Sequence, residues 1–394
     1  MIEVRARLAR GAVFLSGETV ECFITFGNPS PDPDTQSRSN SDIEENLAWA
    51  SAQIHCQCSV DDTKVKFPIS TSLSQEELAT ASKDTSFIPC RGENGHIVLS
   101  TKPKILFCDV RLAPGESKTY LYKETIPNEG PPSYRGQAVK YAYKITIGTQ
   151  RVNAVIKLMK IPIRVLVLNN LSDFNFHMES DEMQVAPTNP FLQSQQKESS
   201  MEIALQVLEM ITARRNPSFY NITNQNGKVV RFCILKSAYR LGEDIIGIFD
   251  FTKATVPCVQ FSVMLQSEEI LKEECCIKSK PSIMTVTYTK HHEFCLFLDH
   301  TQMILPIPLT ITPAFSSEVV SLQWKLHFEF VTTTSQIPDV LPSSSPSESV
   351  MWQGPSSLDV QTMVWDLPVM VYPTHPVHIA QGLPIKCENS LIIT

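Results

Sequence analysis

The chain has 394 residues, of which 42% are hydrophobic and 19% are charged, so its length allows two to three domains and its apolar content allows proper cores. Its formal net charge is −7. Nucleic-acid binding depends on clustered Lys and Arg, and because the chain has no basic stripe, we expect no nucleic-acid partner. The first residues do not have the pattern of a signal peptide, and no apolar run approaches the roughly 18 residues of a membrane helix.

The number and positions of the cysteines indicate whether the protein resides in a reducing or an oxidising compartment of the cell. There are 11 of them, an odd number. Most lie within apolar strand patterns, for example Cys22, Cys108, Cys233, Cys258 and Cys295. This placement is typical of small buried hydrophobic residues in a reducing compartment, so the sequence predicts a cytoplasmic protein.

Alternating apolar and polar residues predict strands through most of the chain. In the first half they are expected at residues 4–26, 47–58, 104–112, 118–126, 139–147 and 157–168. Between them, residues 28–46 consist of Pro, Asp, Ser and Asn with almost nothing apolar, and residues 68–86 are again polar, so we expect loops there. The second half shows the same alternation after residue 217.

One unit of the first half recurs in the second. Pro131-Pro132-Ser133-Tyr134-Arg135-Gly136 is a proline turn that runs into a strand with Val139, Tyr141 and Tyr143 on one face. Thr312-Pro313-Ala314-Phe315 runs into a similar strand. The offset between the two units is constant at 181: Pro313 corresponds to Pro132 (313 − 132), and Trp324 corresponds to Tyr143 (324 − 143). Tyr134 therefore corresponds to Phe315, which predicts a buried aromatic residue at each strand entry.

Two further pieces recur in the same order. The turn Gly17-Glu18 corresponds to Gly242-Glu243, with an offset of 225 (242 − 17). The closing strand Lys160-Ile161-Pro162-Ile163 corresponds to Asp366-Leu367-Pro368-Val369, with an offset of 206 (368 − 162). Unequal offsets place the length differences in loops, where insertions are tolerated. The sequence thus predicts two tandem copies of one β-sandwich.

The domain boundaries follow from this repeat. We expect an N-terminal sandwich over 1–171, a linker over 172–216, a C-terminal sandwich over 217–373 with a loop insert at about 333–354, and a tail over 374–394. The linker has a helical pattern at 201–213, with Leu205 and Leu208 on its apolar stripe. This stripe is interpreted as packing on its own sandwich, and the alternative is that Leu205 and Leu208 dock on a partner.

Motifs for catalysis or metal binding were sought along the whole chain. His292-Glu293 begins like a zinc-protease helix, but the motif requires histidine where Leu296 stands. His291, His292, Cys295 and His300 do not have the spacing of a metal site and are interpreted as strand residues. Cys56-Gln57-Cys58 and Cys275-Cys276 also have the wrong spacing. We therefore expect no catalytic residues, no bound metal and no cofactor.

Two short motifs could bind partner domains. Pro131-Pro132-Ser133-Tyr134 has the form of a WW-domain ligand, but a buried Tyr134 would prevent this, and burial is the favoured interpretation. Asn189-Pro190-Phe191 lies in the linker and resembles the tripeptide bound by EH domains. We keep it as a candidate partner-binding site.

The motifs together resemble those of arrestin-like domains. The resemblance rests on Gly17-Glu18, Leu112-Ala113-Pro114-Gly115 and the 131–136 turn before a Tyr-rich strand. It implies an all-β fold of two tandem arrestin-like, immunoglobulin-like sandwiches, with a linker that contains one short helix.

A closer resemblance is to the Rgp family, the smaller subunits of Ric/Rgp guanine-nucleotide exchange complexes for the Golgi Rab-six GTPase. It covers nearly the whole chain. The segments that show it are Ala48-Trp49-Ala50-Ser51-Ala52-Gln53-Ile54-His55-Cys56, Pro103-Lys104-Ile105-Leu106-Phe107-Cys108-Asp109, Tyr239-Arg240-Leu241-Gly242-Glu243-Asp244 and Leu326-His327-Phe328-Glu329-Phe330-Val331.

This resemblance implies a non-catalytic scaffold subunit. Its expected partners are a large β-propeller-containing subunit of the Ric type, the Rab-six GTPase and, through the complex, the Golgi membrane surface. The protein would be cytoplasmic and peripheral on that membrane, and would support retrograde endosome-to-Golgi and intra-Golgi transport. The alternative function is a free-standing arrestin-like adaptor that sorts membrane cargo.

Overall fold

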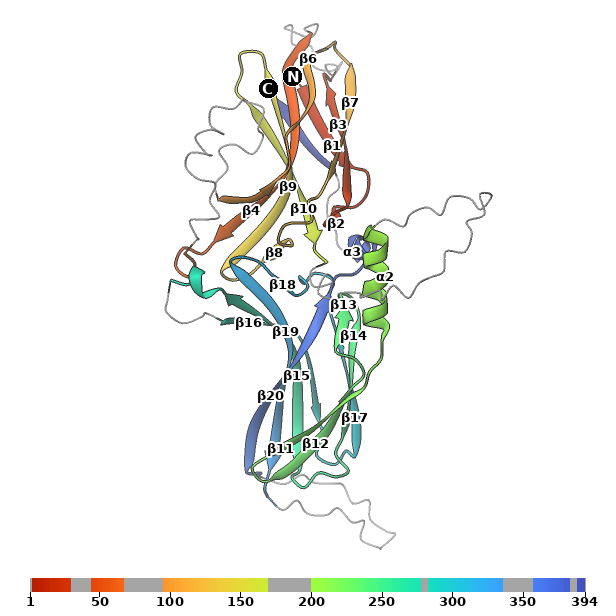
Figure 1. Cartoon of the computed structure of the whole chain (residues 1–394), viewed down its shortest axis with the longest axis vertical. Helices are drawn as coiled ribbons and strands as arrows, with labels where there is room; N and C mark the ends of the chain where they lie inside the picture. Colours follow the sequence, from red (N-terminus) through yellow and green to blue (C-terminus); the bar gives the residue numbers. More distant parts are fainter. Residues whose placement is uncertain are drawn as a thin grey trace, which may run out of the picture.

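The structure is a computed structural model that describes residues 2–29, 44–66, 95–168, 200–277, 283–335, 357–382 and 388–393. Nearly all of its regular elements are strands, which form four sheets arranged as two sandwich-like bodies stacked along the long axis (Figure 1). The predicted all-β fold of two sandwiches with one linker helix is confirmed. Three predictions lie wholly or largely outside the described residues: the Asn189-Pro190-Phe191 motif, the loops at 28–46 and 68–86, and the 333–354 insert.

The N-terminal sandwich consists of a four-stranded sheet, in the order β21-β1-β3-β7, and a larger sheet in the order β2-β10-β9-β4-β5. Two further strands join the larger sheet, because β6 pairs with β4 and β8 with β9. The strands are β1 (Ile2–Leu8), β2 (Val13–Leu15), β3 (Thr19–Gly27), β4 (Glu45–Val60), β5 (His96–Ser100), β6 (Lys104–Leu112), β7 (Ser117–Thr125), β8 (Tyr134–Arg135), β9 (Val139–Arg151), β10 (Lys157–Leu166) and β21 (Glu388–Ile393).

The C-terminal sandwich repeats this plan with the sheets β11-β12-β14-β17 and β13-β20-β19-β15-β16, and β18 pairs with β19. The elements from the linker onward are α2 (Ser200–Ala213), β11 (Ser218–Asn224), β12 (Gly227–Ile234), β13 (Ala238–Arg240), β14 (Asp244–Asp250), β15 (Cys258–Leu271), η2 (Glu273–Cys275), β16 (Ile283–Phe294), β17 (His300–Pro306), β18 (Phe315–Ser316), β19 (Val320–Thr333), β20 (Val360–Tyr372) and α3 (Pro376–Gly382).

The two Gly-Glu turns have the same geometry in both copies. Gly17 and Gly242 both have φ of 83°, a left-handed conformation that glycine adopts without steric cost. The carboxylate of Glu18 accepts a hydrogen bond from the Leu15 N–H (2.7 Å), and that of Glu243 accepts one from the Arg240 N–H (3.0 Å). These shared details support the duplication that the sequence indicates.

The prediction that residues 374–394 form a tail is wrong for the parts that the structure describes. Helix α3 packs beside β2, and β21 pairs antiparallel with β1 along its whole length, with Ile393 opposite Ile2. Accordingly, the two chain ends lie close together in Figure 1. Ile393 is buried because alternate residues of β21 face the core. In the first sandwich β21 therefore fills the edge position that β11 fills in the second.

The cores are built from the alternate strand residues that the pattern predicts. In the second sandwich the rings of Phe232, Phe249 and Phe328 lie in mutual contact, with centroid separations from 4.9 to 6.4 Å. Such aromatic contacts add to the stabilisation from apolar burial.

Most of the described cysteines are buried, as expected, and burial raises the pKa of Cys22, Cys56 and Cys58 to about 12. Thiols of this kind remain protonated at neutral pH and are poor nucleophiles. Cys108 is exposed instead, so the prediction of burial is wrong for this residue. Its side chain points away from the core on strand β6.

Candidate functional site

The linker helix α2 joins the second sandwich through its buried face. Leu208 is only 2% exposed, and Leu205 is half-buried and packs against the core. Met210, on the opposite face of the helix, is 67% exposed. The helix thus packs within its own chain, as the favoured interpretation of its stripe expects, and Leu208 has almost no surface to offer a partner.

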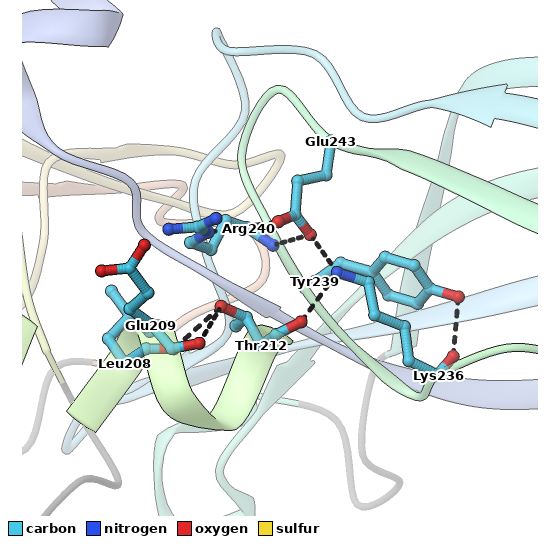
Figure 2. Close-up of polar contacts among 7 residues, drawn as sticks. All are labelled: Leu208, Glu209, Thr212, Lys236, Tyr239, Arg240 and Glu243. Carbon is cyan, nitrogen blue, oxygen red and sulfur yellow. Dashed lines mark hydrogen bonds and ion pairs between the residues drawn. The ribbon is translucent and has the colours of Figure 1, made fainter. Parts of the chain in front are cut away.

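Helix α2 ends against the Gly-Glu turn of the second sandwich, as Figure 2 shows. Lys236 Nζ donates to the Thr212 carbonyl (2.9 Å) and to Glu243 Oε2 (2.6 Å), while Arg240 Nε donates to Glu243 Oε1 (3.1 Å). A cation at a helix C-terminus satisfies carbonyls that have no partner within the helix. Glu243, singled out in the sequence as a turn residue, therefore holds the lysine that binds the end of the linker helix.

The surroundings of Glu243 set its ionisation. Partial burial acts to raise its pKa, but the hydrogen bonds from Lys236 and the Arg240 backbone have the larger combined effect. The pKa of Glu243 consequently lies below its ordinary value of 4.5, and the group is a carboxylate at neutral pH.

A groove of about 490 Å³ lies beside this junction. It is lined by Thr212, Ala213, Arg215, Leu235, Lys236, Tyr239, Gly242, Glu243, Asp244 and Ile246. The groove thus connects the end of α2 with the first residues of β14, on the outer side of the second sandwich.

The two proline-led turns meet where the sandwiches join. Pro131, Pro132 and Tyr134 are buried, and the ring of Tyr134 packs edge-on against Phe315 with a centroid separation of 5.1 Å. The prediction of a buried aromatic at each strand entry is confirmed. A WW-domain ligand must be exposed and extended, so that interpretation of residues 131–134 is wrong.

Two charged side chains in this joint, one buried and one half-buried, bind backbone groups of the opposite sandwich. Glu269, on β15, is 2% exposed and accepts hydrogen bonds from the N–H groups of Gln137 (2.6 Å), Ala138 (3.1 Å) and Val139 (3.1 Å). Arg164, on β10, donates to the carbonyls of Leu309 (2.9 Å) and Ile311 (2.7 Å), and burial lowers its pKa.

Gly136 belongs to this joint as well, because a Cβ atom there would lie 2.5 Å from Glu269 Oε1. Sequence analysis identifies Gly136 as a motif residue but misses Glu269 and Arg164. The available signal for Glu269 was its position in the apolar alternation of β15, where it shares the inward face with Leu271.

The candidate metal-binding histidines have other contacts. His292 Nδ1 lies 2.9 Å from the Ser262 hydroxyl, and His291 lies 3.5 Å from a carboxylate oxygen of Glu293. Among the described residues, no group of three or more His, Cys, Asp or Glu side chains is placed to hold a metal ion. Within the same ranges, no helix combines the length and the apolar character needed to cross a membrane.

The fold and this site define a protein of two β-sandwiches that are joined by charged side chains bound to backbone groups and linked by a docked helix. The family model described as Rgp1 matches residues 34–180 and 167–333. The chain therefore belongs to the Rgp1 family.

Two curated relatives extend this similarity to the whole chain. It is 47% identical to RAB6A-GEF complex partner protein 2 of Homo sapiens over 401 aligned positions, which cover 100% of both chains. It is 46% identical to the protein of the same name from Bos taurus over 383 positions, covering 95% of each chain.

Proposed function

We propose that this chain is the smaller, non-catalytic partner subunit of a guanine-nucleotide exchange complex that activates a RAB6A-type GTPase. The observation that carries the proposal is the 47% identity, over the full length of both chains, to a protein named as a RAB6A-GEF complex partner. The aligned region includes both sandwiches, α2 and β21.

The resemblance to Ric/Rgp complexes supports a more detailed proposal. The partner is a larger subunit that contains a β-propeller, and the pair acts on the cytoplasmic face of Golgi membranes in retrograde transport. The chain reaches that membrane as a peripheral component, through the complex.

The proposed role is that of a platform. Exchange factors act by displacing the switch regions and Mg²⁺ that hold the nucleotide phosphates. In this chain the buried and half-buried charged side chains have structural partners instead: Glu269 and Arg164 bind backbone groups across the joint, and Glu243 binds Lys236, which in turn binds the end of α2. This use of charge favours a subunit that positions its partners.

The test is a nucleotide-release assay with three protein samples. RAB6A is loaded with fluorescent GDP and mixed with this chain alone, with the larger subunit alone, or with the co-expressed pair. We expect the chain alone to leave the release rate within about twofold of the intrinsic rate, and the pair to accelerate release by at least about a hundredfold, or about 2.7 kcal/mol in activation free energy.

Each outcome has a clear meaning. Acceleration by this chain alone would show that it is catalytic, and no acceleration by the pair would end the proposal. The adaptor alternative expects a chain that is purified without a larger subunit and binds cargo tails, so stable co-purification of the pair counts against it.

A further inference from the structure

The outer face of the sheet β11-β12-β14-β17 has an apolar centre. Phe219 is 59% exposed, Ile246 37%, Ile248 41% and Ile304 52%. In the strand register Ile246 lies opposite Ile304, and Cys233 lies between Phe219 and Ile248. The four exposed side chains, with Cys233 (9% exposed) between two of them, therefore form one patch across all four strands, which we call the outer apolar patch. Contiguous exposed patches of this kind mark interaction sites more often than scattered apolar residues do.

The duplicated sheet in the first sandwich is an internal reference for this patch. Glu21 and Lys123 occupy the positions of Ile246 and Ile304, by the offsets of the repeat (246 − 21 = 225 and 304 − 123 = 181). They form an ion pair of 2.9 Å.

A second pair of positions differs in the same way. Arg7 and Glu388 lie opposite each other in the first sandwich, where Cys233 and Phe219 lie opposite each other in the second. The same fold thus tolerates charged pairs at these positions. At these two pairs of positions the apolar residues of the second copy are therefore not required by the architecture, whereas Ile248 has an apolar counterpart in Phe23 (248 − 225 = 23).

The charges around the outer apolar patch indicate what covers it. Arg231 stacks on the ring of Phe219 at 4.5 Å, and Asp250 faces His300 at 3.8 Å. Arg215 and Asp244 add one charge of each sign at the end near α2. An anionic membrane surface attracts clusters of Lys and Arg, and this balanced rim has no such cluster. An uncharged centre with a balanced polar rim is complementary to an apolar protein surface without strong net charge.

The patch is continuous with the groove at the end of α2, because Ile246 lines both. In Figure 1 the helix lies above β14 and β17, on the same side of the molecule. A protein seated on the patch would thus reach the linker helix as well as the second sandwich. Permanent interfaces are larger and more apolar than transient ones, which favours a permanent subunit over a GTPase that must be released.

We propose that the outer apolar patch binds an apolar face of the permanent larger subunit of the exchange complex. This inference rests on the proposed function and adds the surface through which the two subunits assemble.

The test transfers the charged pair of the first sandwich to the second. The double variant Ile246→Glu/Ile304→Lys places in the patch the ion pair that Glu21 and Lys123 form at the equivalent positions. The variant is expected to fold, with a melting temperature close to that of the wild type. The matched control is Leu121→Glu, which puts a charge on the outer sheet of the first sandwich at a residue that is 53% exposed.

The measurement is co-purification with the tagged larger subunit after co-expression, followed by a dissociation constant from the purified chains. We expect the double variant to bind at least about tenfold more weakly, and Leu121→Glu to bind as the wild type does. Equal binding by the double variant and the wild type would overturn the assignment of this surface and leave the proposed function standing.

Two further outcomes are also decisive. A wild-type chain that never binds the larger subunit would overturn the proposed function together with this surface. A wild-type chain that is dimeric in size-exclusion chromatography, and is made monomeric by the double variant without loss of subunit binding, would overturn the proposal in favour of a second copy as the occupant.

Discussion

The two proline-led turns complete their hydrogen bonds in different ways. In both, the first residue after the short strand donates to the strand that follows: Gly136 N to the Val139 carbonyl and Ser317 N to the Val320 carbonyl, each at 2.9 Å. In the second turn the Ser317 hydroxyl also accepts from Val320 N (3.1 Å). The equivalent of Ser317 in the first turn is Gly136 (317 − 136 = 181), which has no side chain to do this.

Glu269 of the opposite sandwich supplies the missing acceptor for the first turn. The first sandwich has no equivalent carboxylate to bind the second turn, because Cys58 occupies the position of Glu269. Cys58 pairs with Tyr141, and Glu269 pairs with Leu322, the counterpart of Tyr141 (322 − 141 = 181). There Tyr141 reaches across the joint instead, with its hydroxyl 3.0 Å from the Ser317 hydroxyl. One turn is thus completed locally and the other by its neighbour, so the duplicated units have become dependent on each other at their joint.

Removal of the Glu269 carboxylate is the strongest way to break this arrangement. Glu269→Ala leaves the buried N–H groups of Ala138 and Val139, and the part-buried one of Gln137, without their acceptor, and we expect the free energy of unfolding to fall by about 3 kcal/mol. Urea-induced unfolding of the wild type and the variant measures this difference in free energy. The control is Glu268→Ala, at the neighbouring residue. The Glu268 carboxylate forms a partly exposed ion pair with Lys325, so its loss should lower the free energy of unfolding by less than about 1 kcal/mol. Equal losses for the two variants would contradict the role given to Glu269.

The local completion of the second turn predicts a smaller effect. Ser317→Ala removes the hydroxyl that serves Val320 N and contacts Tyr141, and the expected loss is about 1 kcal/mol. Ser316→Ala, at the exposed neighbour, should leave stability unchanged. A loss for Ser317→Ala as large as that for Glu269→Ala would show that both turns depend equally on the joint.

The smallest expected effect concerns the Gly-Glu turns and is seen in the pH dependence of stability. Because the folded-state pKa of Glu243 is lowered, its ionisation stabilises the fold fully above its ordinary value of 4.5, and this contribution is lost as pH falls through the lowered pKa. We expect Glu243→Gln to reduce the melting temperature by a few degrees near pH 7 and by progressively less as pH approaches about 3.

The matched turn of the first sandwich is the comparison. Glu18 has a more distant cation, Arg10 at 3.9 Å, so Glu18→Gln should produce a smaller change near neutral pH. A difference between wild type and Glu243→Gln that does not depend on pH would show that charge plays no part at this turn.

The sequence predicted what depends on local pattern. Strand alternation, the Gly-Glu turns and the equivalence of Tyr134 and Phe315 gave the duplicated sandwich and a buried aromatic in each copy. That these two rings touch each other was not predictable, because nothing in a repeat says how its copies are arranged.

The groups that escaped prediction act over long distances in the chain. Glu269 binds backbone groups about 130 residues earlier, and the partners of Arg164 lie beyond residue 300. The outer apolar patch is visible only when strand register places Phe219, Ile246 and Ile304 on one face. Strand β21 was missed because six residues with a short apolar run, Leu391-Ile392-Ile393, have a weak signal on their own.

The pairing of β21 with β1 has a consequence for synthesis of the chain on the ribosome. Strand β21 begins 386 residues after β1 (388 − 2), so at 5–20 residues per second it emerges roughly 20 to 80 s later. Throughout that interval one side of β1 has no neighbour, and an uncovered strand edge is a template for pairing with other chains. The sandwich formed from residues 218–372 has all its strands before β21 is made. The first sandwich therefore begins to emerge first but completes its sheet last. Until β21 is translated, the free edge of β1 in the nascent chain needs protection from pairing with other chains.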